Sequence, residues 1–285
     1  MYFLSVILVL LAIPGDLQAP RTVTGTGLDV DLYGNRYVVD RTQNTLRKFS
    51  ATDTLVNEIG GPGWENDQFD SPTAVWARNG IDVFVADYGN HRIQRFDRNL
   101  NYVSTFTTRE FIDTDLRFGY PVDVAVSRLG DLFICDTENT RIMKINSQSR
   151  EALVFGGFDA GKGRLLAPRQ LEIGPHDRIY VLDGVRVLVF DTFGNFIQAI
   201  GREFPGNAVI FADEMGLVVV SDNNIYLFDD NDRLVTTAGV PHEEGTAAWM
   251  VHAVSLSQSH MYFLTDTGLE ISANPRIELD KRLTK

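Results

Sequence analysis

Six copies of one strand-ending pattern are spread evenly along the chain and limit this sequence to a small set of folds. In each copy a short apolar stretch ends in an aspartate, and successive aspartates are 47, 49, 47, 39 and 44 residues apart. Self-similarity at such a period indicates a repeat architecture. The copies are NRYVVD at Asp40, DVFVAD at Asp87, DLFICD at Asp136, RIYVLD at Asp183, LVVVSD at Asp222 and MYFLTD at Asp266.

Each copy contains further short apolar segments separated by turn residues. One apolar stretch precedes the aligned strand, a third strand follows it, and most copies continue into a fourth. Four short strands joined by hairpin turns make a small antiparallel sheet. One such sheet cannot bury both of its faces, but several sheets packed radially around an axis can do so, and this period is typical of a propeller blade. The sequence therefore predicts an all-β fold, a six-bladed β-propeller of four-stranded antiparallel blades.

Two segments could supply the outer strand of the last blade. Residues 276–280 follow the sixth copy directly, whereas the segment RTVTG at 21–25 precedes the first copy. A strand contributed from the N-terminal side would join the two ends of the ring and protect both edges from pairing with other chains. We expect this clasp.

The first 19 residues differ in character from the rest of the chain. Residues 2–13 form an apolar run that is followed by a Pro-Gly break and by Ala19. This length is typical of a signal-peptide core and is too short for a membrane-spanning helix. No Lys or Arg precedes the run, and Leu17 is large for its position, so a buried strand and an uncleaved anchor remain alternatives. We expect a signal peptide over 1–19, a single propeller domain over 20–285, and export to the periplasm or the cell exterior.

Charge and cysteine content exclude several classes of function. The formal net charge of −12 disfavours nucleic-acid binding and affinity for anionic lipid surfaces, because both require clustered Lys and Arg. Cys135 is the single cysteine, so no intramolecular disulfide can form, and its apolar strand predicts a buried, inert thiol. No cysteine lies directly after the apolar run, so we expect no covalent lipid anchor. The run is also too short to span a membrane, so we expect no transmembrane anchor in the mature chain.

The turns after the second and third aspartates resemble the NHL-repeat family. The segments that resemble this family are ADYGNHRIQRF and CDTENTRIMKI, together with SPTAV, YPVDV and APRQL, which precede the aligned strands. VDRTQNTLRKF is a looser match with Thr45 where the family has Arg, and the last three copies lack the Asn-x-Arg pattern. The resemblance in repeat architecture thus covers the whole chain, whereas the specific sequence motif is present only in its first half.

The shared residues of this motif predict a structural role. Asp87 and Arg92 flank a hairpin turn closely enough to pair, and Asn90 can adopt a positive φ or bond to local backbone. Six equivalent aspartates are better explained by turn formation than by six catalytic acids. The motif residues are Asp40, Asp87, Asn90, Arg92, Asp136, Asn139, Arg141, Asp183, Asp222 and Asp266.

No catalytic or metal-binding constellation is readable from spacing. The five histidines lack the one-turn spacing of helical zinc motifs, and no serine lies in a Gly-x-Ser-x-Gly elbow. The NHL resemblance includes enzymes such as the lyase of peptide amidation, which holds a metal in its central channel with histidines, and of the histidines here His252 alone lies at an expected channel mouth. We predict no catalytic residue and no cofactor. Whether the channel binds a metal is left open by the sequence.

The loops that lead into the innermost strands are the most promising binding positions, because they form a shared surface around the axis. Trp64 and Trp249 lie on loops where an exposed indole could anchor a partner, although packing is the favoured role of Trp64. Trp76 is expected in the core. The channel-mouth candidates are Thr26, Thr73, Asp123, Arg169, Gln170 and His252.

The sequence therefore favours an exported, non-enzymatic propeller that serves as a protein- or peptide-binding scaffold, for example as a subunit of an envelope complex. The alternative is a metal-dependent hydrolase or lyase with its site at the mouth of the central channel. That alternative needs carboxylates, amides or imidazoles that converge from different blades.

Overall fold

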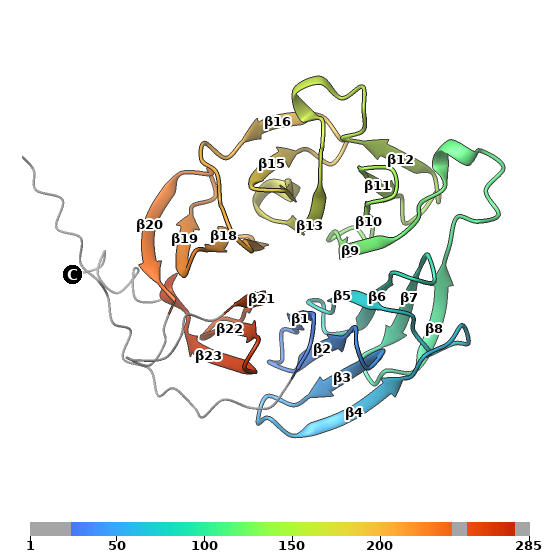
Figure 1. The fold of residues 1–285 in the computed structure, drawn as a ribbon, viewed down its shortest axis with the longest axis horizontal. Coiled ribbons are helices and arrows are strands. Elements are labelled where there is room, and N and C mark those ends of the chain that lie inside the picture. The colour runs from blue at the N-terminus through green and yellow to red at the C-terminus, as the bar shows by residue number, and fades with distance from the viewer. Residues whose placement is uncertain (1–23, 241–249, 277–285) are drawn as a thin grey trace, which may run out of the picture.

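The computed structural model describes residues 24–240 and 250–276. Six small antiparallel sheets surround a central axis, and each sheet is one blade (Figure 1). The chain passes once around the ring, from blade 1 in blue to blade 6 in red. The predicted all-β six-bladed propeller is confirmed. Three short 3-10 turns lie in the connections, η1 (Thr114–Leu116), η2 (Gly161–Gly163) and η3 (Pro175–Asp177).

Within each blade the strands follow one another from the axis to the rim, and we name these positions A to D. Blades 1 to 3 contain β1 (Gly27–Val30), β2 (Arg36–Asp40), β3 (Thr45–Phe49) and β4 (Leu55–Gly60); β5 (Pro72–Trp76), β6 (Asp82–Asp87), β7 (Arg92–Asp97) and β8 (Tyr102–Phe106); and β9 (Pro121–Val126), β10 (Leu132–Asp136), β11 (Arg141–Ile145) and β12 (Ala152–Phe155). Blades 4 to 6 contain β13 (Pro168–Ile173), β14 (Ile179–Asp183), β15 (Arg186–Phe190) and β16 (Phe196–Ala199); β17 (Val209–Asp213), β18 (Gly216–Ser221), β19 (Asn224–Phe228) and β20 (Leu234–Gly239); and β21 (Val251–Leu256), β22 (His260–Thr265) and β23 (Leu269–Ala273).

The position of a strand in its blade explains its sequence pattern. Every residue of the B strands β2, β10, β14 and β18 is buried, because neighbouring blades cover both faces of the strand. These strands are accordingly near-continuous apolar runs. The residues of the rim strand β4 are instead exposed or half-buried, because one face of this strand is in contact with water.

The innermost strands close the ring. Each A strand contacts the A strands of the two neighbouring blades, and β21 of blade 6 lies beside β1 of blade 1. Leu28 and Val38 of blade 1 share a core cluster with Leu264 of blade 6, so the closure is apolar. Thr26 N donates to Val39 O, and the described end of the segment RTVTG therefore leads into β1. Residues 21–23 and 277–280 lie outside the described residues, and the clasp stays a prediction.

The expected signal peptide over residues 1–19 also lies outside the described residues. Within the ranges that the structure does describe, no helix is long and apolar enough to cross a membrane.

Candidate functional site

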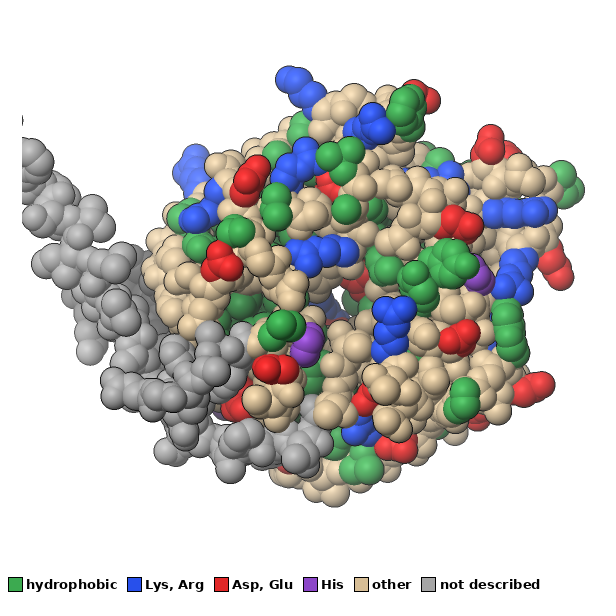
Figure 2. Space-filling model, in the orientation of Figure 1, with side chains coloured by type: hydrophobic (Ala, Val, Ile, Leu, Met, Phe, Trp, Pro, Cys, Tyr) green, Lys and Arg blue, Asp and Glu red, His purple; other side chains and the backbone are tan. Residues whose placement is uncertain are grey.

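The antiparallel blades give the ring two distinct faces. The A–B turns and C–D turns lie on one face, which we call the A–B face. The B–C turns and the connectors between blades lie on the other, which we call the connector face. Figure 2 shows one face of the ring, where the channel opens as a hollow in the middle and charged and hydrophobic side chains are interspersed around it.

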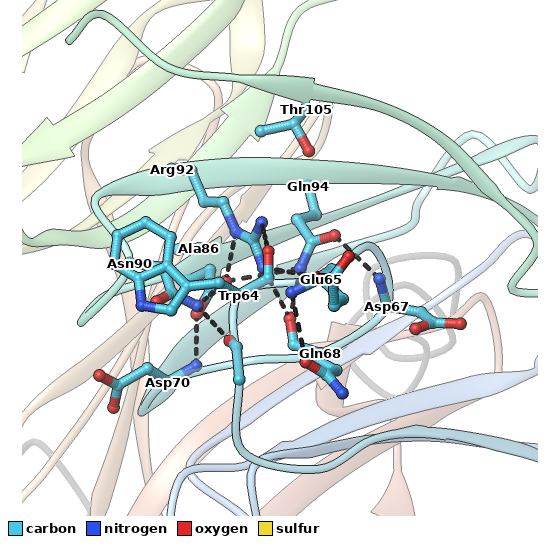
Figure 3. A network of polar contacts seen from close by, with 12 residues as sticks. Trp64, Glu65, Asp67, Gln68, Asp70, Ala86, Asn90, Arg92, Gln94 and Thr105 are labelled. Carbon is cyan, nitrogen blue, oxygen red and sulfur yellow. Dashed lines mark hydrogen bonds and ion pairs between the residues drawn. The ribbon is translucent and has the colours of Figure 1, made fainter.

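The NHL-like motif of blade 2 holds the connector from blade 1 in place (Figure 3). Arg92 Nε donates to Asp87 Oδ2 at 2.7 Å, and Asp87 is fully buried. The other guanidinium nitrogens of Arg92 donate to the carbonyl oxygens of Trp64 at 2.7 Å, Glu65 at 3.1 Å and Gln68 at 2.9 Å. One arginine therefore satisfies a buried carboxylate and three carbonyls of an irregular loop, as buried polar groups require.

Blade 3 repeats this arrangement. Arg141 Nε donates to Asp136 Oδ2 at 3.0 Å, and its remaining nitrogens donate to Asp115 O at 2.7 Å and Arg117 O at 2.8 Å. Asn139 Nδ2 donates to Asp136 Oδ2 at 2.8 Å. The predicted pairing of aspartate with arginine is present in both motif copies.

One detail of the turn differs from the prediction. Asn90 was expected to adopt a positive φ or to bond to local backbone, but its Nδ2 donates to the side-chain Oδ2 of Asp87 and to Gly63 O of the connector, each at 2.8 Å. The positive φ lies one residue later, at His91 with φ 50° and at Thr140 with φ 53°. Asparagine is thus used here for its amide, and the next residue takes the left-handed conformation.

Asp40, Asp183 and Asp266 also bind the segments that lead into their own A strands. Asp183 accepts from Leu166 N at 2.8 Å and Ala167 N at 2.6 Å, and Asp266 accepts from Met250 N at 3.1 Å. Thr24 Oγ1 donates to Asp40 at 2.9 Å. Asp222 follows β18 in a turn with φ 46°. This placement agrees with a structural role for the repeated aspartate.

The channel-mouth candidates line one polar cavity of about 160 Å³ at the axis. Several of their side chains hydrogen-bond to a neighbouring blade. Thr26 Oγ1 donates to Pro72 O at 3.3 Å, and Thr73 Oγ1 donates to Pro121 O at 3.1 Å. Leu171 N donates to Asp123 Oδ2 at 2.8 Å, and Gln170 exchanges two bonds with the backbone of Ile210, at 2.8 and 2.9 Å.

Within residues 24–240 and 250–276, Arg169 and His252 form no such bond between blades. Arg169 Nη2 donates to Gly184 O at 2.9 Å within its own blade, and burial lowers the pKa of this guanidinium. His252 is exposed at the mouth. These two residues are the candidates whose polar groups are available to a ligand, and their binding role stays a prediction.

Deeper in the channel, Arg78 crosses from the A–B turn of blade 2 to three other blades. Its Nε lies 3.3 Å from Asp29 Oδ1 of blade 1, and its Nη2 lies 2.6 Å from Glu172 Oε2 of blade 4. Its Nη1 donates to Ala212 O at 2.6 Å, and its Cζ lies 4.3 Å from the ring centroid of Phe211, both in blade 5. Sequence reasoning missed this network, although acids inside the apolar stretches LDVDL and QLEI were a usable signal.

The channel network contains more carboxyl groups than cations. Burial raises the pKa of Glu172 to about 8, and nearby Asp123 and Asp29 oppose its ionisation further, while Arg78 favours it. Burial also raises the pKa of Asp123 to about 7, against two backbone N–H bonds that favour its charged form. Both groups therefore hold protons near neutral pH more readily than they would in the unfolded chain.

This network makes stability depend on pH. An acid whose pKa is raised on folding stabilises the fold below its unfolded pKa, and that contribution is lost as pH rises through the folded pKa. For Glu172 the window runs from pH 4.5 to about 8. We expect the free energy of unfolding to fall by roughly 3 kcal/mol between pH 5 and pH 8, and Glu172→Gln to flatten this slope. Urea unfolding curves at several pH values test this, and equal slopes for both proteins would contradict it.

A second cavity of about 1040 Å³ lies between blades 2 and 3. It begins among the A–B turns near the axis, at Arg78, Arg128 and Glu214, and reaches Phe106 and Phe111 at the rim. Sequence reasoning did not predict this groove, because its walls come from separate blades and from the connector after β8.

The predicted aromatic anchors have different positions. Trp64 is 55% exposed on the connector face, with the guanidinium of Arg109 at 4.5 Å from its ring centroid. Trp76 is buried in the core, as expected. Trp249 lies outside the described residues. Cys135 is buried, and burial raises the pKa of its thiol well above the usual value.

Three of the remaining histidines lie within the described residues, and His242 lies outside them. His91 and His176 lie in turns, and His260 begins β22. Within residues 24–240 and 250–276, no three His, Cys, Asp or Glu side chains are grouped in a way that could hold a metal ion.

The matches to known proteins agree with the repeat. Residues 118–144 match the family model of the NHL repeat, and this segment contains β9, β10 and most of β11 with the Asp136 and Arg141 pair. The Protein brain tumor of Drosophila melanogaster is 32% identical over 149 residues, which are 50% of this chain and 14% of that protein. The chain therefore spans a small part of the length of this relative.

Solved structures share the fold across nearly the whole chain. A gluconolactonase from Xanthomonas campestris has a TM-score of 0.61 at 12% identity and covers 88% of this chain and 87% of its own. A virginiamycin B lyase from Staphylococcus aureus, solved with quinupristin, has a TM-score of 0.58 at 14% identity and covers 90% and 88%. At these identities the likeness shows the fold alone. The repeated motif, the matched repeat of blade 3 and the ring of six blades show that this chain is a six-bladed β-propeller that contains an NHL repeat.

Proposed function

We propose that this propeller is a scaffold that binds a protein partner through its A–B face. The observation that carries the proposal is a set of exposed apolar side chains on the A–B turns. Leu129 is 81% exposed in blade 3, and Ile81 and Met215 are exposed in the equivalent turns of blades 2 and 5. Leu32 and Tyr33 of blade 1 are also exposed and lie against Gly80 of blade 2. We call these five residues the apolar tips.

The apolar tips lie at one end of the ring, on the A–B turns of blades 1, 2, 3 and 5, where one partner can contact several of them. Exposed apolar groups that cluster in this way mark interaction surfaces, and an interface needs such a centre with a polar rim. The rim here contains the ion pair of Arg128 with Asp177 at 3.1 Å and with Glu214 at 3.3 Å. A protein partner fits this mixture better than a membrane, because carboxylates among the turns and a net charge of −12 repel anionic lipid.

Peptide selection on the immobilised protein tests the proposal. Peptides enriched from a displayed random library are expected to bind at least tenfold more weakly to a Leu129→Ser/Met215→Ser variant, because apolar contact area is lost. The matched control is Trp64→Ser, which removes an exposed aromatic from the connector face and should leave these affinities unchanged. Loss of binding on the Trp64 variant alone would place the site on the other face and overturn the proposal.

Export of the protein is the second part of the proposal, and it rests on the apolar run at residues 2–13. A mature protein whose mass lacks residues 1–19 would support cleavage after Ala19. An intact N-terminus on the protein recovered from cells would contradict it.

The alternative function is that of a metal-dependent hydrolase or lyase with its site at the channel mouth. Arg169 and His252 line a polar cavity there, and within the described residues neither bonds to another blade. Metal analysis by mass spectrometry of the purified protein tests it. Stoichiometric calcium, zinc or iron would favour this alternative over the scaffold, and retention of less than one ion in ten molecules would count against it.

A further inference from the structure

The groove between blades 2 and 3 combines an aromatic wall with a charged rim. The wall contains Trp76 and Phe84, whose rings meet edge to face at 5.9 Å, and Phe106 and Phe111, whose rings meet at 6.4 Å. Phe84, Phe106 and Phe111 are only partly buried, so ring surface remains open to a ligand. Aromatic side chains prefer such edge-to-face contacts, and a further ring can join the set.

The charges along the rim are not evenly compensated. Arg95 pairs with Asp82 at 2.8 Å, and Arg128 pairs with Asp177 and Glu214. Arg150 is exposed, lines the same groove as these aromatic rings and forms no ion pair with a residue of the described ranges. Its backbone is held in a left-handed conformation, with φ 59°, by the bond from Arg150 N to Asn146 O at 3.0 Å. A guanidinium in this position can receive a carboxylate in a bidentate manner.

The dimensions of the groove favour a peptide over a free small molecule. Its volume of about 1040 Å³ is at the upper limit of sites that enclose small ligands. It also opens among the A–B turns, where Leu129 precedes the lining residue Gly130. A segment of a partner docked on the apolar tips can therefore continue into the groove.

We infer that this groove recognises an acidic peptide segment that presents an aromatic side chain to the wall and a carboxylate to Arg150. The inference rests on the proposed scaffold function and names the chemistry of its partner. The aromatic group supplies buried apolar area, and the carboxylate supplies specificity, since an uncompensated guanidinium disfavours basic peptides.

Three fluorescein-labelled heptapeptides test the inference by fluorescence anisotropy. They share Gly-Ser flanks and differ only in a central Phe-Asp-Asp, Ala-Asp-Asp or Phe-Lys-Lys. We expect Phe-Asp-Asp to bind at least tenfold more tightly than either of the others. Equal affinities, or no binding of any peptide, would overturn the inference.

A charge reversal supplies the matched variant. Arg150→Glu should weaken Phe-Asp-Asp at least tenfold and strengthen Phe-Lys-Lys, whereas Arg109→Glu on the connector face should change neither. Phe111→Ser should weaken both phenylalanine peptides by a similar factor. Circular dichroism of each variant verifies that it is folded, and an Arg150→Glu protein with unchanged preference would contradict the assignment.

The outcomes separate this inference from the proposed function. If peptides selected on the apolar tips bind but the three heptapeptides do not, the inference about the groove is wrong and the proposed scaffold function still holds. Free 3-phenylpropionate should displace Phe-Asp-Asp only at 100-fold or greater excess. Equal potency of this small carboxylate would show that the groove takes free aromatic acids and would overturn the peptide assignment.

Discussion

Replacing Arg92 by alanine is expected to lower the free energy of unfolding by about 4 kcal/mol. The change leaves the carboxylate of Asp87 buried without its cation, and burial already raises the pKa of that group. It also removes the donor to the carbonyl of Trp64, whereas Glu65 O keeps the bond from Gln68 N and Gln68 O keeps the bond from Gln94 Nε2. Urea unfolding followed by tryptophan fluorescence measures the loss, and Trp64 should become more exposed in the folded state as its loop is released.

Blade 4 offers the matched control for this prediction. Arg186 pairs with Asp183 in the same hairpin position, but 36% of its side chain is exposed, and within the described residues its guanidinium bonds to no connector carbonyl. Arg186→Ala should therefore cost less, about 2 kcal/mol, although Asp183 is itself buried. Equal losses for the two variants would show that the connector bonds of Arg92 contribute nothing.

Replacing Arg78 by alanine is expected to cost about 3 kcal/mol, the second largest effect. Asp29 and Glu172 would then share a buried site with no cation, and breaking a buried pair in this way is strongly destabilising. The loss is at the lower end of that range, because 23% of the Arg78 side chain faces the channel and a proton on Glu172 can partly replace the guanidinium. Urea unfolding at pH 7 measures this loss.

Arg128 is the control for Arg78. It also contacts two carboxylates of other blades, Asp177 and Glu214, but lies exposed to solvent on the A–B face. Water and salt screen such pairs, so Arg128→Ala should leave the free energy of unfolding essentially unchanged. A loss in the Arg78 variant no greater than in the Arg128 variant would refute the role of Arg78 in joining the blades.

The repeat made the architecture predictable, because each blade uses the same chemistry at the same place. An aspartate that ends a buried strand marks every blade, and the structure shows why, since Asp87, Asp136 and Asp183 each accept backbone N–H groups of the segment leading into the A strand. The channel-lining positions followed from the same alignment. What the alignment could not supply is whether a side chain there bonds to the next blade, as Thr26 and Gln170 do.

Interactions between blades escaped the sequence because they join residues far apart in the chain. Arg78 lies in an ordinary turn, ARNG, and only the closed ring brings Glu172 to it. In blade 1, where the motif is a looser match, the pairing of the repeated aspartate with an arginine is retained but was not predicted. Arg47, two residues after the Thr45 that breaks the pattern, pairs with Asp40 at 3.1 Å. The groove is the extreme case, since no single segment contains both its aromatic wall and Arg150.

Hydrogen exchange measured by mass spectrometry, with and without a saturating peptide selected on the protein, tests the central claim most directly. The claim is that partners dock on the A–B face. Docking on this face should slow exchange in peptides that contain the A–B turn at residues 127–131 and the C–D turn at 146–150, and should leave the B–C turn at 88–92 unchanged. Slower exchange at 88–92, with none in the A–B turns, would contradict it.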